Sequence, residues 1–311
     1  MRFLLIQAAL AAIFAQLSPQ LRAGESAVPL RVEELELPSA STAALRAAIA
    51  AGEWASAEGI LFDAASSNPG SPSALRALGI AHYQAGRYFL AGAALKKADA
   101  LVPLDPEARF LLAAAFIRVD RRHWARAELE TLVAKHGASA SHQLALARVH
   151  YDQGQFAAAL SRLDRLLEAA PDWAAAHDLR GQSLEGLGRN EAAAAAYKKS
   201  IALSHEKVPA AAWPRYHLGS LLHDEGRLEA AEAALATAVS LDREHAPAQR
   251  ELGVVYLKAG KFKLAAKALE RAAELSPLDA AVQYSLVAAY RRLDEQGLAK
   301  AALERFRQIT E

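Results

Sequence analysis

The sequence predicts an all-α fold in which helical hairpins stack side by side as an α-solenoid. Three observations carry this prediction: turn-forming residues recur about every 34 positions, alanine follows each of them at a fixed distance, and amphipathic helical patterns flank every turn. One hairpin cannot bury its apolar faces alone, so the repeats must pack on their neighbours. A chain of 311 residues can then fold as a linear array instead of around one central core.

The clearest copy of the repeat runs from Ala246 to Asp279. It contains two segments with apolar residues at i, i+3/i+4 and i+7, the spacing of an amphipathic helix. Between them lies Gly260, where a helix C-terminus needs a left-handed residue. Pro277 is expected to end the second segment, and Asp279 is placed to cap the helix that follows.

The break between paired helices is marked by glycine in six repeats and by aspartate in two. Aspartate adopts a left-handed conformation more readily than most other non-glycine residues. The spacing is 34 residues throughout, apart from 38 between Gly188 and Gly226. The break residues are Gly52, Gly86, Asp120, Gly154, Gly188, Gly226, Gly260 and Asp294, and the alanines five residues later are Ala57, Ala91, Ala125, Ala159, Ala193, Ala231, Ala265 and Ala299.

With a small residue in the first helix and an aromatic residue after the break, this pattern resembles the tetratricopeptide repeat (TPR) family. The small residues are Gly79, Ala113, Ala147, Gly181, Gly219 and Gly253, and the aromatic residues are Trp54, Tyr88, Phe156 and Phe262. Small residues let two helices approach closely, and a larger side chain there would overpack by roughly 1–3 kcal/mol. The resemblance implies a right-handed superhelix of about eight helix-turn-helix units, at about 38–71, 72–105, 106–139, 140–173, 174–207, 212–245, 246–279 and 280–311.

The two terminal repeats depart from this pattern. Leu45 in the first repeat and Val287 in the last stand where the others have a small residue. Terminal repeats are commonly atypical, because one side faces solvent. The last helix, about residues 297–310, is predicted to close the stack with one apolar side formed by Leu298, Ala302, Leu303, Phe306 and Ile309.

Two internal places also depart from the pattern. In the third repeat, the second helix can be placed in two frames: Ala125 with Leu129 keeps the strict period, whereas Trp124 with Ala127 and Ala134 fits the aromatic–alanine pattern if the loop is two residues longer. The sequence does not decide between these frames. Four extra residues around 206–211 predict a longer loop near Pro209.

Residues 1–23 have the pattern of a secretory signal peptide, with Arg2 before an apolar run and cleavage expected after Ala23. The run is too short for a comfortable membrane span. We therefore expect an exported TPR protein of bacterial type, most simply in a periplasm. The alternative is an uncleaved anchor, and only that alternative implies membrane association. Residues 24–37 show no helical period and are expected to form a tether or an extended lead-in.

Composition and motifs give no support for catalysis, metal binding or nucleic-acid binding. The formal net charge of +1 offers no electrostatic case for a nucleic-acid partner, and the absence of cysteine excludes disulfides and thiolate metal sites. No P-loop, Gly-x-Gly-x-x-Gly, His-Glu-x-x-His or EF-hand motif is present. We expect the ten histidines to be packed or solvated. The sequence predicts no enzyme, no catalytic, cofactor-binding or metal-binding residue, no cofactor and no small-molecule substrate.

The TPR resemblance implies a concave groove lined by the first helices, where partners usually bind. Aromatic and arginine side chains often dominate binding energy at interfaces. The same residues are also compatible with ordinary packing between repeats, and the sequence leaves both interpretations open. By position, the groove candidates are Arg76, Tyr83, Phe110, Arg148, Tyr151, Trp213, Tyr216, His223, Arg250, Tyr284 and Arg291, with Ile80, Gln182 and Arg292 beside them.

Three hypotheses for function follow. The first is a non-enzymatic protein–protein interaction scaffold or adaptor of the cell envelope, which binds peptide or protein segments in the concave groove. The second is a structural subunit of a larger secretion, pilus or envelope-assembly complex that uses convex or edge surfaces. The third, a regulatory module of an enzyme, fits least because no residues beyond the array remain for a catalytic domain. The partner, the pathway and the oligomeric state stay open.

Overall fold

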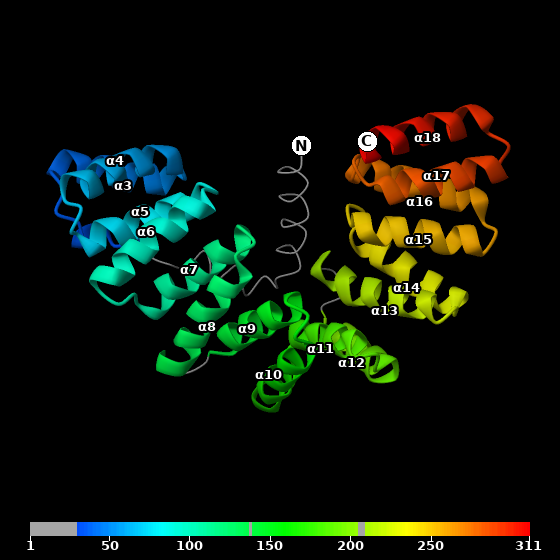
Figure 1. The fold of residues 1–311 in the computed structure, drawn as a ribbon, viewed down its shortest axis with the longest axis horizontal. Coiled ribbons are helices and arrows are strands. Elements are labelled where there is room, and N and C mark those ends of the chain that lie inside the picture. The colour runs from blue at the N-terminus through cyan, green and yellow to red at the C-terminus, as the bar shows by residue number, and fades with distance from the viewer. Residues whose placement is uncertain (1–29, 137–138, 205–208) are drawn as a thin grey trace. The chain divides into compact units, whose positions relative to one another are not determined.

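The computed structural model describes residues 30–136, 139–204 and 209–311, and the predicted signal peptide lies outside them. In the described residues the chain forms sixteen α-helices, two short 3-10 helices and no strand (Figure 1). The helices pair into eight hairpins, which confirms the predicted all-α solenoid. None of the described helices combines the length and apolar character that a membrane crossing needs. The first helices are α3 (Ser39–Ala51), α5 (Pro72–Gln84), α7 (Pro106–Arg118), α9 (Ala140–Asp152), α11 (Ala174–Gly186), α13 (Ala212–Asp224), α15 (Ala246–Lys258) and α17 (Ala280–Arg292); the second helices are α4 (Trp54–Ser67), α6 (Tyr88–Leu101), α8 (Arg122–His136), α10 (Phe156–Ala169), α12 (Asn190–Leu203), α14 (Leu228–Leu241), α16 (Phe262–Leu275) and α18 (Gln296–Thr310).

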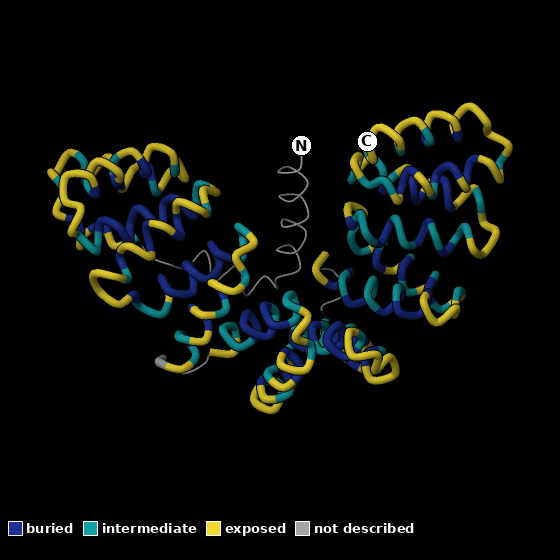
Figure 2. The backbone as a smooth tube through the Cα atoms, viewed as in Figure 1, coloured by how far each residue is buried: buried dark blue, intermediate teal, exposed yellow. Residues whose placement is uncertain are grey.

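The chain divides into two compact bodies: an N-terminal body that ends at Leu166 and a C-terminal body that begins at Leu167. Within each body, the second helix of one repeat packs on the first helix of the next, as α6 does on α7 and α14 on α15. First helices also contact first helices, as α5 does α7 and α15 does α17. First helices are therefore more enclosed, and α5 buries ten residues where α6 buries five (Figure 2).

All eight break residues have the left-handed backbone that the sequence predicts. The six glycines have φ between 70° and 76°, and Asp120 and Asp294 have φ of 57° and 58°. In the repeat that starts at Ala246, the Lys261 amide donates to the Tyr256 carbonyl at 2.9 Å, which satisfies a carbonyl at the end of α15. The turn residues therefore fix where each first helix stops.

The small residues of the first helices allow close contact with the second helices, as predicted. A methyl group on Gly253 would lie 2.6 Å from Cγ of Leu269, which is fully buried. At Gly181 the neighbour is the ring of Tyr197, also fully buried, with which an added Cβ would collide. Van der Waals contact of this kind, repeated in successive hairpins, replaces a bulky central core.

Helix caps recur in register with the repeat. Asp279 accepts a hydrogen bond from the Ala281 amide at 2.9 Å, which confirms its predicted role as the N-cap of α17. An N-cap side chain satisfies an amide that has no partner within the helix. Four residues in the same position of other repeats cap their helices in this way: Ser71, Asp105, Ser139 and His245.

The structure decides the frame of the third repeat. Helix α8 begins at Arg122, and both Ala125 and Leu129 are fully buried, whereas Trp124 is 43% exposed. The strict 34-residue frame therefore holds, because Ala125 takes the close contact and Ala127, which the other frame would place there, is exposed. In the loop near Pro209, residues Pro209–Ala211 form a 3-10 turn before α13, and residues 205–208 lie outside the described part.

Two details differ from the sequence prediction at the ends of the array. In α18, Leu298 is 46% exposed, so its place on the apolar side was wrong. The buried face centres on Ala299 and Ala302, and neighbouring residues differ by about 100° around a helix. In the lead-in, residues 32–34 form a 3-10 turn, because Val32 and Leu35 are buried instead of extending into solvent.

Candidate partner-binding face

The eleven groove candidates all fall on one face of the first helices. Counted back from the break residue, they lie 13, 10, 6 or 3 positions before it. Steps of three and four residues keep side chains on the same side of a helix. We call the side chains at these four positions the first-helix stripe. Tyr216, Arg250 and Tyr284 occupy the same stripe position in three successive repeats.

In the N-terminal body, the aromatic candidates are largely enclosed. Tyr83 is 6% exposed and packs edge-on against Tyr88, with ring centroids 5.1 Å apart. Phe110 is 7% exposed and lies 5.1 Å from the ring of His142 on α9. Tyr151 is only half-buried and lies 5.4 Å below the guanidinium of Arg148. Packing between repeats therefore accounts for much of this part of the stripe.

Three of the arginine candidates are paired with carboxylates of the chain itself. A partner's carboxylate would have to displace these internal ones, so the arginines are not ready-made anion sites. The most exposed of the pairs is that of Arg250, whose side chain is 35% exposed. The pairs are Arg76–Asp105 at 2.8 Å, Arg148–Asp152 at 2.9 Å and Arg250–Asp279 at 3.0 Å.

In the C-terminal body, the stripe is more open to solvent. Tyr284 is 65% exposed, with its ring 5.9 Å from that of Phe306. Arg291 is exposed on the same face, seven residues or about two turns further along α17. Trp213 and Tyr216 are half-buried on α13. Burial raises the pKa of the Tyr216 hydroxyl, so this group stays protonated and can donate a hydrogen bond.

Histidines reinforce this part of the stripe in a way that the sequence prediction missed. The His245 ring lies 4.1 Å from that of Trp213, and His217 pairs with Asp178 of α11 at 2.9 Å. Both histidines hold the rings of α13 against neighbouring first helices. The sequence did contain a signal for His245, because it occupies the position at which other repeats have a capping serine or aspartate.

The candidate His223 has a structural partner. It is 7% exposed, and its Nδ1 lies 2.6 Å from the Glu251 carboxylate on α15. The ring thus joins two first helices and turns away from solvent. Among the described residues, no group of three or more His, Cys, Asp or Glu is placed to hold a metal ion.

Comparison with known proteins identifies the family. A family model described as "Tetratricopeptide repeat" matches residues 42–106, 110–172, 144–212, 179–248, 216–280 and 250–310. The chain belongs to the tetratricopeptide repeat family. Proteins with this fold generally mediate protein–protein interaction and are typically non-catalytic scaffolds.

Solved TPR structures share the fold at low sequence identity. A tetratricopeptide repeat protein from Parabacteroides merdae is 14% identical, with a TM-score of 0.66 over 79% of this chain and 95% of that one. The APC/C hetero-tetramer Cut9–Hcn1 gives 19% identity and a TM-score of 0.61 over 79% of this chain, which spans only 48% of the matched one. MamA 41-end from Desulfovibrio magneticus RS-1 is 20% identical, with a TM-score of 0.50 over 56% of this chain and 96% of that one. The search among curated proteins found no match.

Proposed function

We propose that this TPR protein is a non-enzymatic scaffold of the cell envelope that binds a segment of a partner protein along the first-helix stripe of its C-terminal body. One observation carries the proposal: Tyr216, Arg250 and Tyr284 present aromatic and cationic groups at one position of three successive repeats. Such side chains supply most of the binding energy at many interfaces. The contacts of α13 with α15 and of α15 with α17 make these three helices one continuous surface.

The exposed groups suit a protein segment better than a small molecule. They are spread over three helices instead of converging on one point, and a ligand that reaches all of them must be extended. The Arg250–Asp279 pair is partly solvated, so exchanging its carboxylate for one on the partner costs little. The neutral Tyr216 hydroxyl adds a hydrogen-bond donor for a backbone carbonyl.

A photo-crosslinking experiment tests the binding face. We expect p-benzoylphenylalanine in place of Tyr284 to form a covalent adduct with a partner protein when cells of the native host are irradiated. The matched control carries the same group in place of Leu264, which is 47% exposed on the second helix α16 of the same body. Both variants should unfold at the wild-type temperature. An adduct from position 264 and none from position 284 would move the partner to the second helices and contradict the proposal.

The envelope setting rests on the predicted signal peptide and has its own test. We expect the protein purified from its native host to begin at Gly24, because cleavage is predicted after Ala23. Edman sequencing or intact-mass measurement of the periplasmic fraction reads the terminus directly. A protein that still begins at Met1 and stays with the cytoplasmic fraction would contradict the proposed envelope location. It would not affect the proposed binding face.

A further inference from the structure

An open apolar groove lies in the N-terminal body, between the second helices α6 and α8. Its volume is about 510 Å³, and the C-terminal end of α7 forms its floor. The two walls follow helical spacing, with lining residues at 89, 92, 93 and 96 on α6 and at 124, 127 and 128 on α8. The groove therefore runs along about two turns of α6, or roughly 10 Å, and along about one turn of α8.

The aromatic residues of this groove are not required by the repeat. Phe89 is 65% exposed and Trp124 is 43% exposed. At the position of Phe89 the other seven repeats have alanine, glycine, histidine, glutamate or lysine, and at that of Trp124 they have serine, alanine or leucine. The array folds without large aromatic rings at these positions. Their exposure on facing walls of one groove marks an interaction surface.

Glycine opens the floor of the groove. A methyl group on Gly92 would lie 3.0 Å from the ring of Phe116, so the missing side chain lets that ring form the floor. In the other repeats this position carries alanine, leucine or a charged side chain. Phe116 also packs edge-on against Trp124, with ring centroids 5.3 Å apart, which holds the indole at the rim.

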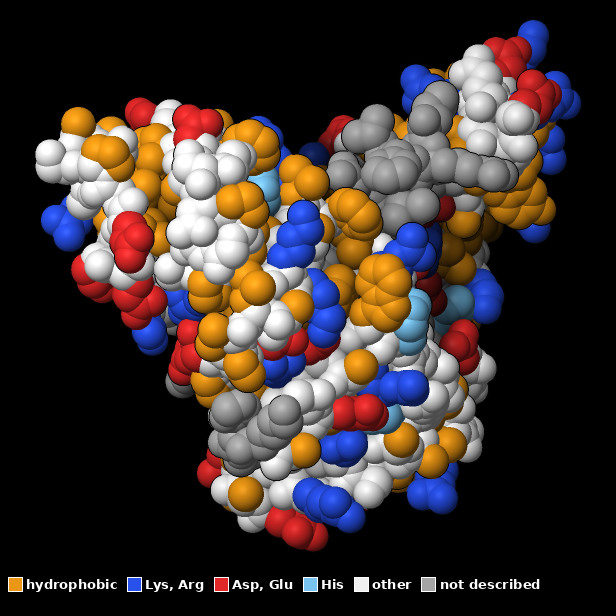
Figure 3. Space-filling model, turned by 60° about the vertical axis from the view of Figure 1, so that its left-hand side comes forward, with side chains coloured by type: hydrophobic (Ala, Val, Ile, Leu, Met, Phe, Trp, Pro, Cys, Tyr) orange, Lys and Arg blue, Asp and Glu red, His pale blue; other side chains and the backbone are white. Residues whose placement is uncertain are grey.

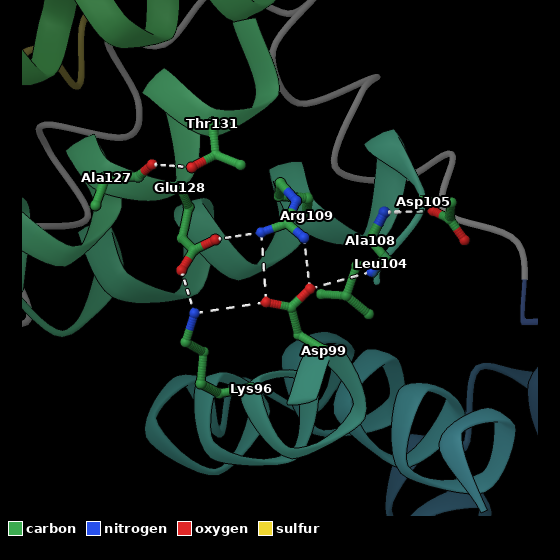
Figure 4. A network of polar contacts seen from close by, with 9 residues as sticks. All are labelled: Lys96, Asp99, Leu104, Asp105, Ala108, Arg109, Ala127, Glu128 and Thr131. Atoms are coloured by element: carbon green, nitrogen blue, oxygen red, sulfur yellow. Dashed lines mark hydrogen bonds and ion pairs between the residues drawn. The ribbon is translucent and has the colours of Figure 1, made fainter. Parts of the chain in front are cut away.

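A polar network, drawn in Figure 4, contains Lys96 and Glu128, the last lining residues of α6 and α8. Glu128 is the carboxylate that lines the groove, and both of its oxygens are occupied: Lys96 donates to one at 2.6 Å and Arg109 to the other at 2.7 Å. Arg109 also donates to Asp99 at 2.5 Å. The groove thus offers no unsatisfied negative charge to a ligand.

The surroundings of the groove are cationic. Lys97 is exposed on α6, and the exposed Arg121 lies over the Trp124 ring at 5.6 Å. Lys96 and Arg109 pair with the two carboxylates of the network, so the positive charge of the rim comes from Arg121 and Lys97. Asp120, at the turn, is paired with Arg122. In Figure 3, which brings the N-terminal body forward, apolar and basic side chains lie next to one another on the surface.

We propose that this groove binds an amphipathic helical segment of a partner protein that has acidic residues beside its apolar face. The shape fits two turns of a helix whose anchors recur at i, i+3 or i+4 and i+7. The cationic rim selects acidic flanks and speeds their encounter. A concave groove with a ring for its floor suits an inserted side chain better than a flat lipid surface. The surface is separate from the first-helix stripe, so the two proposals stand independently.

Two synthetic peptides of roughly 16 residues, about four helical turns, test the proposal. Both carry leucine at i, i+3, i+4 and i+7 spacing, and one has glutamate at the flanking positions where the other has lysine. Fluorescence anisotropy with the full chain measures affinity. We expect the glutamate peptide to bind at least about tenfold more tightly than the lysine peptide. The Phe89→Ser/Trp124→Ser double variant should weaken binding at least about tenfold.

A second variant and a matched control sharpen the test. Ala93→Glu adds a negative charge at an exposed helical position within the groove, and it should weaken the glutamate peptide while leaving the fold intact. The Leu264→Ser/Leu298→Ser variant removes two side chains of similar exposure in the C-terminal body and should leave the affinity unchanged. Thermal unfolding checks that all variants are folded.

Five results would each overturn the proposal. The first three are that neither peptide binds, that both bind with equal affinity, or that the groove variants leave the affinity unchanged. The other two assign a different occupant: self-association in sedimentation that the double variant abolishes would assign the groove to a second copy of the chain, and variant-sensitive binding to phosphatidylglycerol vesicles would assign it to a membrane.

Discussion

Replacing Gly253 by leucine is expected to lower the free energy of unfolding by about 3 kcal/mol. Even the first carbon of a new side chain would lie 2.6 Å from Cγ of Leu269, in a contact with no exposed surface. Helices α15 and α16 would have to separate, and the packing on α14 and α17 would loosen with them. Equilibrium unfolding in urea, followed by circular dichroism, measures the change as a lower midpoint.

The matched control is Gly59→Leu. Gly59 lies within α4, is exposed, and has no heavy atom within 4 Å of the place of an added Cβ. The same substitution there should be neutral or stabilising by up to about 0.8 kcal/mol, because leucine favours a helix more than glycine does. A Gly253→Leu protein with the wild-type midpoint would contradict the view that helix contact through small residues holds the array together.

The framework was predictable because its constraints are local and strict. A left-handed backbone at Gly260 and Asp294, and a close contact at Gly253, each tolerate few residue types, so the sequence shows them. The frame of the third repeat was not predictable, since both alternatives bury apolar residues. Only the structure shows that Ala125 is enclosed between the helices and that Ala127 is exposed.

The sequence predicted where the candidate side chains lie, but not that some of them form salt bridges within the chain. Their place on the stripe follows from the position in the repeat, whereas each salt bridge of Arg76 and Arg250 depends on a residue of the next repeat. Arg76 pairs with Asp105 and Arg250 with Asp279, in both cases the N-cap of the following first helix, 29 positions later. An arginine followed by aspartate at that distance was the signal that sequence reasoning passed over.

The apolar groove escaped prediction for a different reason. Phe89 and Trp124 are 35 positions apart and belong to different repeats. Each is one unusual residue in the sequence, and only the structure brings both to one groove. The departure of the Trp124 region from the repeat pattern was visible beforehand, but its exposed partner on α6 was not.

His245 should make the stability of the C-terminal body depend on pH. Its Nδ1 accepts a hydrogen bond from the Ala248 amide at 3.1 Å, and only a neutral imidazole nitrogen can accept there. The side chain is 3% exposed. Burial is the main cause that lowers its pKa to about 4; the Asp242 carboxylate opposes this shift, and nearby His217 adds to it.

The sign of the effect follows from this shift. In the unfolded chain His245 titrates near 6.5, above its folded value, so the unfolded state takes up the proton first as the pH falls. The stabilising contribution is complete above about pH 6.5 and is lost progressively toward pH 4. A shift of this size corresponds to about 3 kcal/mol. Urea midpoints measured from pH 7.5 to 4 should fall accordingly.

His245→Asn isolates this contribution from that of the other titrating groups. Asparagine caps a helix well and does not titrate, so the variant should match the wild type near pH 7.5 to within about 1 kcal/mol and lose less stability on acidification. The difference between the two pH profiles then belongs to one side chain. Parallel profiles would mean that the imidazole is accessible to protons in the folded state, and that the neutral cap of α15 is not what acidification breaks.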